Sequence, residues 1–323
     1  MRRNLLSIGL LVCVLCVILQ AQTPIVPKAP FTAADLELGK KLSARSQELR
    51  REITGNRQAG PFKIIGDLYF AGSAIGEHVF LLTSPQGHIL LGTGYEKDQL
   101  DVEKNIQTLG FKMTDIKIVV APHWHPDQAG GAAYLKQKTG ATLYAGIADI
   151  PFIENGGDIP SGTAIPRGPD TPAAENAQQI PAVKVDRALF DGDGIKLGPW
   201  GVTTYNIPGH TPGSMSFVYT VRDGNRDFKV FEFCCGQNYP NDVGKNPNFS
   251  EAAVRHSAET FRKILPIDIY LGGTDSSGWI TDHLAKIKAG DKMALVDRTI
   301  FPAFTALREV EFEEKFSKSN RFK

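Results

Sequence analysis

Residues 117–131 read KIVVAPHWHPDQAGG, an apolar run that leads directly into a cluster of polar side chains. The run from Lys117 to Val120 predicts a fully buried strand, because it has no alternating polar face. His123 and His125 follow at a spacing of two residues, and side chains at this spacing in an extended segment point the same way. A helix is predicted next, over residues 129–139. The sequence therefore places a pair of imidazoles at the end of a buried strand.

A second histidine segment follows a later predicted strand. It reads Ile207-Pro208-Gly209-His210-Thr211-Pro212-Gly213-Ser214, and its glycines and prolines predict tight turns. Neutral imidazole is a natural zinc ligand, and a catalytic zinc takes three protein ligands and keeps one position open. A histidine pair alone can also have a structural or capping role. Because each segment follows a strand, in corresponding halves of the chain, we favour a zinc site formed by His123, His125 and His210.

The rest of the pattern predicts two strand-rich halves, each followed by helices. In the first half, β-type runs separated by turn residues lie at 62–65, 68–70, 79–83, 88–91 and 117–120, with helices at 97–109 and 129–139. In the second half, strands are predicted at 142–145, 183–185, 195–197, 202–207, 215–221, 229–233 and 267–271, with a helix at 250–265 and a helical C-terminus. This order predicts two sheets face to face with helices outside. The expected fold is α/β, a four-layer αββα sandwich in a single domain at residues 60–323, after an N-terminal arm and helix at residues 22–59.

The composition is that of an ordinary globular protein, with 42% hydrophobic and 22% charged residues in a chain of 323. Lysine and arginine total 36 against 35 acidic residues, so the formal net charge is +1. This balance provides no basic surface for nucleic acid. We therefore expect no nucleic-acid partner, while the oligomeric state is left open.

The N-terminus has the features of a secretory signal peptide. Arg2 and Arg3 precede an apolar run from Leu5 to Leu19, and the small residue Ala21 follows. We expect residues 1–21 to be cleaved. The alternative is an uncleaved membrane anchor, but the run is shorter than the ~20 residues that a spanning helix needs. The mature protein is therefore expected to be periplasmic or secreted, with no stable membrane insertion.

Two of the four cysteines, Cys13 and Cys16, lie within the predicted signal peptide. The other two, Cys234 and Cys235, are adjacent, and neighbouring cysteines rarely bridge each other. We therefore expect no disulfide framework in the mature chain. An exported protein without one is most often a periplasmic protein large enough to fold without cross-links.

The two histidine segments resemble those of a known family. The run from His123 to Gln128 resembles the H-x-H-x-D-H signature of the metallo-β-lactamase superfamily, and residues 209–213 resemble its second histidine loop. Residues 81–91 and 183–193 are similar to segments of subclass-three metallo-β-lactamases. The likeness covers roughly residues 60–315 and implies an αββα sandwich and an exported zinc hydrolase that acts on a small-molecule substrate.

The resemblance also implies roles for single residues. His123, His125 and His210 match the three-histidine site of the first zinc. Asp127 matches the aspartate that contacts a second zinc and orients the attacking hydroxide, so it is the candidate catalytic residue. The segment from Gly92 to Gly94 differs from the family, which has an aspartate at the first position that supports the histidine loop.

The second metal site departs from the family pattern. Gln128 stands where the signature ends in histidine, and Thr274 stands where a later histidine ligand is expected. Amide and hydroxyl oxygens are weak zinc ligands beside imidazole or thiolate. Cys235 lies near the position where another subclass uses a cysteine ligand, and it could restore the site. We therefore expect one tightly bound zinc, with a possible second site of Asp127, Gln128, Cys235 and Thr274.

The resulting hypothesis is an exported zinc-dependent hydrolase that cleaves a cyclic amide or ester, a β-lactam or a lactone, with a zinc-bound hydroxide. Zinc lowers the pKa of its bound water to about 7 and polarises the substrate carbonyl. Two alternatives remain. One is a periplasmic binding protein or pseudoenzyme on the same fold that keeps a metal but turns over little substrate. The other is an ester or thioester hydrolase of the same superfamily.

Overall fold

The computed structural model describes residues 30–49, 60–157, 179–234 and 250–318, apart from the side chains of residues 273–277 and 315–318. The predicted signal peptide at residues 1–21 and Cys235 lie outside these ranges. Among the described helices, none is both long and apolar enough to cross a membrane.

The first sheet has seven strands, which follow one another in chain order. The first four form an antiparallel meander, and β4 to β7 run parallel. Tight turns suffice for the antiparallel neighbours, whereas parallel neighbours need crossover connections, which α3 (Gln99–Thr108) and α5 (Ala132–Thr139) provide for β4–β5 and β5–β6. The strands are β1 (Phe62–Ile65), β2 (Leu68–Phe70), β3 (Phe80–Leu82), β4 (His88–Leu91), β5 (Ile116–Ala121), β6 (Thr142–Gly146) and β7 (Arg187–Leu189).

The second sheet has five strands in the order β12-β11-β10-β9-β8. Strands β8 to β11 form an antiparallel meander, and β12 pairs with β11 in parallel. The crossover between these last two contains α8 (Glu251–Lys263), whose first turn is capped by the side chain of Ser250. The strands are β8 (Gly194–Leu197), β9 (Trp200–Asn206), β10 (Met215–Asp223), β11 (Arg226–Phe233) and β12 (Ile269–Gly272).

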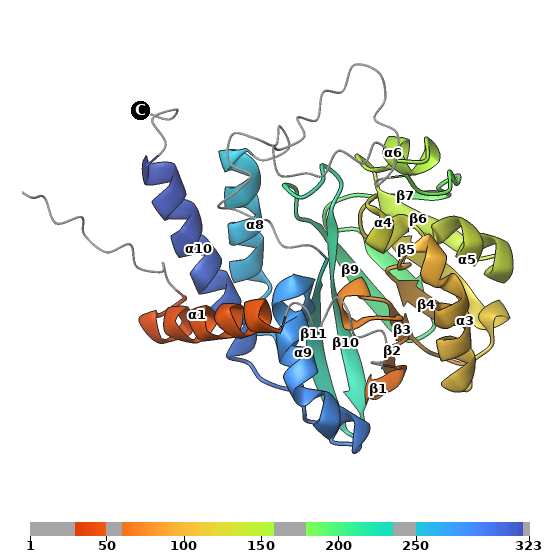
Figure 1. The fold of residues 1–323 in the computed structure, drawn as a ribbon, viewed down its shortest axis with the longest axis horizontal. Helices are drawn as coiled ribbons and strands as arrows, with labels where there is room; N and C mark the ends of the chain where they lie inside the picture. Colours follow the sequence, from red (N-terminus) through yellow and green to blue (C-terminus); the bar gives the residue numbers. More distant parts are fainter. Residues whose placement is uncertain (1–29, 50–59, 158–178, 235–249, 319–323) are drawn as a thin grey trace, which may run out of the picture.

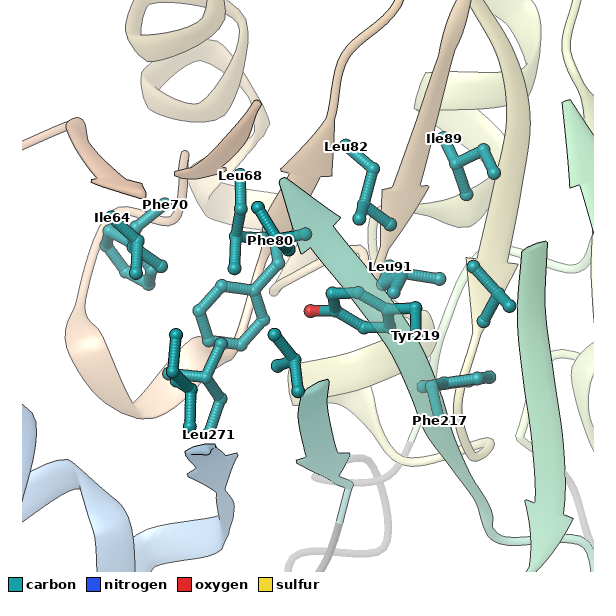
Figure 2. Close-up of a cluster of buried hydrophobic side chains, with 14 of the residues drawn as sticks. Ile64, Leu68, Phe70, Phe80, Leu82, Ile89, Leu91, Phe217, Tyr219 and Leu271 are labelled. Carbon is teal, nitrogen blue, oxygen red and sulfur yellow. The ribbon is translucent and has the colours of Figure 1, made fainter. Parts of the chain in front are cut away.

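The two sheets pack face to face with helices on both outer faces (Figure 1). Phe80 and Leu91 of the first sheet meet Tyr219 and Leu271 of the second in the buried core between them (Figure 2). Helices α3 and α5 cover the other face of the first sheet. Helices α8 and α10 (Ile300–Lys318) cover the other face of the second sheet, and α1 (Ala33–Glu48) packs on α10. This arrangement confirms the predicted four-layer αββα sandwich.

Successive side chains along β10 are buried on opposite faces of the sheet. Phe217, Tyr219 and Val221 point into the core between the sheets, whereas Val218 points to the helices outside. Successive side chains of a strand point to opposite faces, so a strand covered on both faces needs apolar residues at successive positions.

One predicted strand is in the wrong place. Residues 183–185 form no strand, because their backbone groups bond elsewhere. Val183 N donates to Ile153 O at 3.4 Å, and Val185 N donates to Glu154 Oε1 at 3.0 Å. Both acceptors belong to α6 (Ile150–Glu154), so the chain joins the sheet only at Arg187, where β7 begins.

The structure corrects one further prediction and contains one helix that was not predicted. The strand at residues 142–145 was assigned to the second half, but as β6 it pairs in parallel with β5 and belongs to the first sheet. In addition, α9 (Gly273–Lys288) follows β12 directly, and no pattern predicted this helix.

One edge of the sandwich brings the two histidine segments together. β5 ends immediately before the segment that holds His123 and His125, and the loop between β9 and β10 holds His210. Met215 N, at the start of β10, donates to Pro122 O at 2.9 Å. The end of a strand in one sheet is thereby joined to the start of a strand in the other.

Candidate metal centre

The first two histidines lie between β5 and the short helix α4 (Pro126–Ala129). Pro126 occupies the first turn of α4, where the missing N–H of proline has no cost. His125, which precedes it, is extended at φ −66° and ψ 156°, as a residue before proline tends to be. An extended backbone directs His123 and His125 to the same side.

His210 is placed by a closed loop between β9 and β10. Ile207 N donates to Ser214 O at 2.8 Å, and Gly209 N donates to Thr211 O at 3.2 Å. Gly209 has φ 139°, a conformation that glycine adopts without strain. The loop thereby turns His210 toward the segment after β5.

The three predicted histidines converge. Their ring centroids are 4.7 Å apart for His123 and His125, 4.7 Å for His123 and His210, and 4.6 Å for His125 and His210. The planes of each pair are inclined at 82° to 85°. One ring nitrogen of each residue lies within 4.8 Å of the others. His125 Nδ1 and His210 Nε2 are 2.9 Å apart, so one of them donates a hydrogen bond to the other.

Burial keeps these imidazoles neutral. Loss of hydration, followed by repulsion from His210 and His125, lowers the pKa of His123 well below its usual value. The pKa of His125 is lowered in the same way, and burial lowers the pKa of His210 to about 4. A metal ion binds the neutral form of histidine. Three converging neutral imidazoles therefore fit the donor set of a zinc site.

Asp127 lies beside this cluster. Its Oδ1 is 3.8 Å from His123 Nε2, and its side chain is 34% exposed. Loss of hydration raises the pKa of this carboxyl to about 6, while hydrogen bonds from its own backbone and from the Gln128 side chain lower it. A nearby metal cation would favour the ionised form. Asp127 is thus close enough to take part in chemistry at the three histidines.

The structure describes only part of the predicted second metal site beyond Asp127. Gln128 is buried, with 2% of its surface exposed, and its Nε2 donates to Glu77 O at 3.1 Å. Thr274 lies in the first turn of α9, directly after β12, and its side chain is among those not described. Cys235 lies outside the described residues. Of the possible second-site ligands, the structure brings Asp127 and Gln128 to the edge where the histidines meet.

Cys234 contacts the cluster from the end of β11. Its Sγ lies 3.1 Å from His123 Nδ1, and its side chain is 7% exposed. Cys234 is disulfide-bonded, which corrects the expectation that no disulfide forms, and its partner cysteine is outside the described residues. The sequence pattern pointed to Cys235 as a possible ligand and gave no sign of this contact of Cys234.

The segment from Gly92 to Gly94 has no room for the aspartate of the family pattern. A Cβ on Gly92 would lie 2.2 Å from His78 O, which is far inside contact distance. Thr93 instead fixes the loop after β5, since its hydroxyl donates to Gln128 O at 2.8 Å.

Asp149 is a site residue that no sequence pattern predicted. It follows β6, is fully buried, and accepts hydrogen bonds from both histidine loops, through Trp124 N at 3.2 Å, Thr211 Oγ1 at 2.5 Å and Gly213 N at 2.7 Å. Burial raises its pKa to about 6 against these hydrogen bonds. The one available signal was a lone acidic residue just beyond a strand parallel to β5, which is weak by itself.

Comparison with known proteins places this geometry in a family. The sequence profile of the metallo-β-lactamase superfamily matches residues 74–223. The chain is similar to BJP-1, a subclass B3 metallo-β-lactamase of Bradyrhizobium japonicum, with 31% identity, a TM-score of 0.65, and coverage of 80% of this chain and 94% of that one. It is also similar to a metallo-β-lactamase of Cronobacter sakazakii described by a HARLDQ motif, with 28% identity, a TM-score of 0.66, and coverage of 80% and 98%. That motif ends in Asp-Gln, as does the run from His123 to Gln128.

A curated relative adds a second activity within the same superfamily. Hydroxyacylglutathione hydrolase of Hyphomonas neptunium is 32% identical over 118 residues, which are 36% of this chain and 34% of the relative. The match thus spans about a third of that relative's length. Proteins of this fold typically bind metal ions, and the three converging histidines lie in the matched region. On the family profile and on the similarity to BJP-1 over nearly all of its length, the chain belongs to the metallo-β-lactamase superfamily of hydrolases.

Proposed function

We propose that the protein is an exported zinc-dependent hydrolase that cleaves a cyclic amide or ester. The observation that carries this proposal is the convergence of three neutral imidazoles at the edge where the two sheets meet. Export is supported by Arg2, Arg3 and the apolar run that follows them.

The chain's own residues have distinct roles in this proposal. His123, His125 and His210 would hold the zinc. Zinc at such a site polarises a substrate carbonyl and lowers the pKa of a bound water to about 7. Asp127, 3.8 Å from His123 Nε2, would orient the attacking water and accept its proton. The 34% exposure of Asp127 leaves this carboxyl open to solvent and substrate on one side.

One zinc is proposed to bind tightly. The residues available for a second metal offer a single carboxylate, Asp127, beside the amide of Gln128. Because Gln128 Nε2 is engaged by Glu77 O, only its amide oxygen is available as a ligand. A neutral amide oxygen and the Thr274 hydroxyl are weak zinc ligands, so a tightly held second zinc would need the thiolate of Cys235, which is available only where Cys235 is not the disulfide partner of Cys234.

The substrate class is proposed from the relatives. β-Lactams are favoured by the similarity to metallo-β-lactamases over most of the chain, and lactones present a comparable cyclic carbonyl. A thioester is the next candidate, because hydroxyacylglutathione hydrolase is among the relatives. A metal-keeping binding protein or pseudoenzyme with little turnover is the second candidate function, and Gln128 in the position of a metal-binding histidine favours it.

The test compares the zinc-loaded protein with two histidine variants. Hydrolysis of a chromogenic β-lactam, a lactone and a thioester would be measured for the wild type, His210→Ala and His88→Ala. His88 is also buried, but it lies at the start of β4, opposite the end where the three histidines meet. The proposal predicts turnover of at least one class by the wild type and by His88→Ala, and its loss in His210→Ala. Zinc binding without turnover of any class would favour the binding protein.

A further inference from the structure

A single buried carboxylate joins the two histidine loops. Asp149 precedes α6 at the end of β6, in the first sheet. The loop that carries His210 joins β9 and β10 of the second sheet, and its backbone passes close to Asp149. A Cβ on Gly213 would lie 2.5 Å from Asp149 N and 2.8 Å from Asp149 Cγ. Only glycine at position 213 allows the loop to pack directly on the carboxylate.

Both carboxylate oxygens are used. Oδ2 accepts from Trp124 N at 3.2 Å, and Trp124 lies between His123 and His125 in sequence. Oδ2 also accepts from Thr211 Oγ1 at 2.5 Å, and Thr211 directly follows His210. Oδ1 accepts from Gly213 N at 2.7 Å. Each of the three histidines is thus one residue away from a group held by Asp149.

The hydroxyl of Thr211 extends the network. Ser214 Oγ lies 2.7 Å from Thr211 Oγ1 and accepts from Thr211 N at 3.1 Å. Because Thr211 Oγ1 donates to the carboxylate, it can accept from Ser214 Oγ at the same time. The turn around His210 is therefore held both from inside the loop and from Asp149.

The three groups that hydrogen-bond to the Asp149 side chain are all donors, so the residue at this position must accept at every contact. An ionised aspartate only accepts hydrogen bonds. Asparagine has nearly the same shape, but its NH₂ group would face a donor at one of the three contacts. A buried donor that loses its acceptor is destabilising, because it is left without a hydrogen bond away from water. The site therefore needs a carboxylate at this position and not merely a residue of that size.

We propose that Asp149 is a positioning residue, which fixes the His123–His125 segment and the His210 loop relative to each other and thereby sets the affinity for zinc. This inference rests on the proposed zinc-binding role of the three histidines. Groups that orient metal ligands without touching the metal typically change its affinity 10- to 100-fold when replaced.

The test measures zinc affinity by competition with a chromogenic chelator and, separately, thermal unfolding of the zinc-free protein. The wild type would be compared with Asp149→Asn and with the control Asp268→Asn. Asp268 is also buried and accepts from Lys229 N at 2.8 Å and Arg298 Nε at 2.7 Å. It precedes β12, at the end of the second sheet opposite the histidines. We expect a loss of affinity of roughly ten-fold or more in Asp149→Asn, and an unchanged affinity in Asp268→Asn.

A second pair of variants keeps the proposal testable if Asp149→Asn fails to fold. Thr211→Val removes the hydroxyl that donates to Asp149, whereas Thr211→Ser keeps it. We expect weaker zinc binding in Thr211→Val and near-normal binding in Thr211→Ser.

The outcomes separate this inference from the proposed function. If wild type and Asp149→Asn bind zinc equally well, and Thr211→Val does too, the positioning role is wrong while the zinc site stands. If the variants lose only thermal stability of the zinc-free protein, the role of Asp149 is structural and the inference also fails. A wild type that takes up no zinc overturns both proposals.

Discussion

Cys234 Sγ, a disulfide-bonded sulfur, lies 3.1 Å from Nδ1 of His123, which is one of the three converging histidines. With Nδ1 in contact with the sulfur, Nε2 is the nitrogen left to bind a metal, and Nδ1 would then carry the proton and donate to the sulfur. Groups that accept from the second nitrogen of a metal-binding histidine fix its tautomer and orientation. Here that acceptor is a sulfur, which accepts hydrogen bonds weakly.

Replacing this sulfur should weaken the site. Cys234→Ala removes the acceptor of His123 Nδ1 and leaves the ring free to choose the other tautomer. We expect the affinity for zinc to fall by about ten-fold, measured by chelator competition under conditions that keep the wild-type disulfide intact. An affinity equal to that of the wild type would show that the contact does not orient His123.

Rebuilding the second metal position should raise the zinc content. The double variant Gln128→His and Thr274→His supplies two imidazoles in place of an amide and a hydroxyl. We expect zinc per chain after dialysis to rise from about one to about two, and turnover of a β-lactam to rise with it, because a second metal stabilises the anion that forms as the C–N bond breaks.

Cys235 provides the opposing outcome. If the wild type, kept reduced so that Cys235 is a free thiol, already retains two zinc ions and Cys235→Ser loses one of them, a thiolate has replaced the histidine ligands. The second metal site of this chain would then use a different ligand and bind zinc tightly.

Glu232 predicts a pH dependence of stability that is separate from the metal centre. It is 1% exposed on β11, and Tyr219 Oη donates to it at 3.1 Å. Burial raises its pKa to about 8, against 4.5 for the ordinary carboxyl. The folded protein thus holds a proton that the unfolded chain releases, so the stability from this group is present at low pH and is lost as pH rises toward 8.

The variant Glu232→Gln isolates this effect. Glutamine stays neutral and keeps an oxygen for the Tyr219 hydroxyl. Relative to the wild type, its free energy of unfolding in urea should increase from about pH 5 to about pH 8.5. An equal difference between the two proteins at both pH values would contradict a raised pKa at Glu232.

Most strands and the pairing of His123 with His125 were predictable because their signals are local, whereas His210 was added because its segment also follows a strand and resembles a known histidine loop. The runs at residues 62–91 are separated by tight turns, and the spacing of His123 and His125 after an apolar strand directs both rings together. The order of strands and helices predicted that two sheets pack face to face. These features depend on neighbours in the sequence.

The features that were predicted wrongly or not at all depend on contacts between segments that are distant in the sequence. Residues 183–185 have the composition of a strand, yet their backbone bonds to α6. The sheet to which β6 belongs is decided by its pairing with β5. Asp149 acquires its role only because residues more than sixty positions later in the chain fold back onto it, through Thr211 and Gly213. No local pattern carries that information.

Zinc content per chain is the most direct test of the central claim, that the three histidines form a zinc site. The protein would be loaded with zinc, dialysed and analysed by mass spectrometry of the metal, alongside His123→Ala, His125→Ala and His210→Ala. We predict about one zinc per wild-type chain and nearly complete loss in each variant. Full zinc content in any of the three variants would contradict the assignment of that histidine as a ligand.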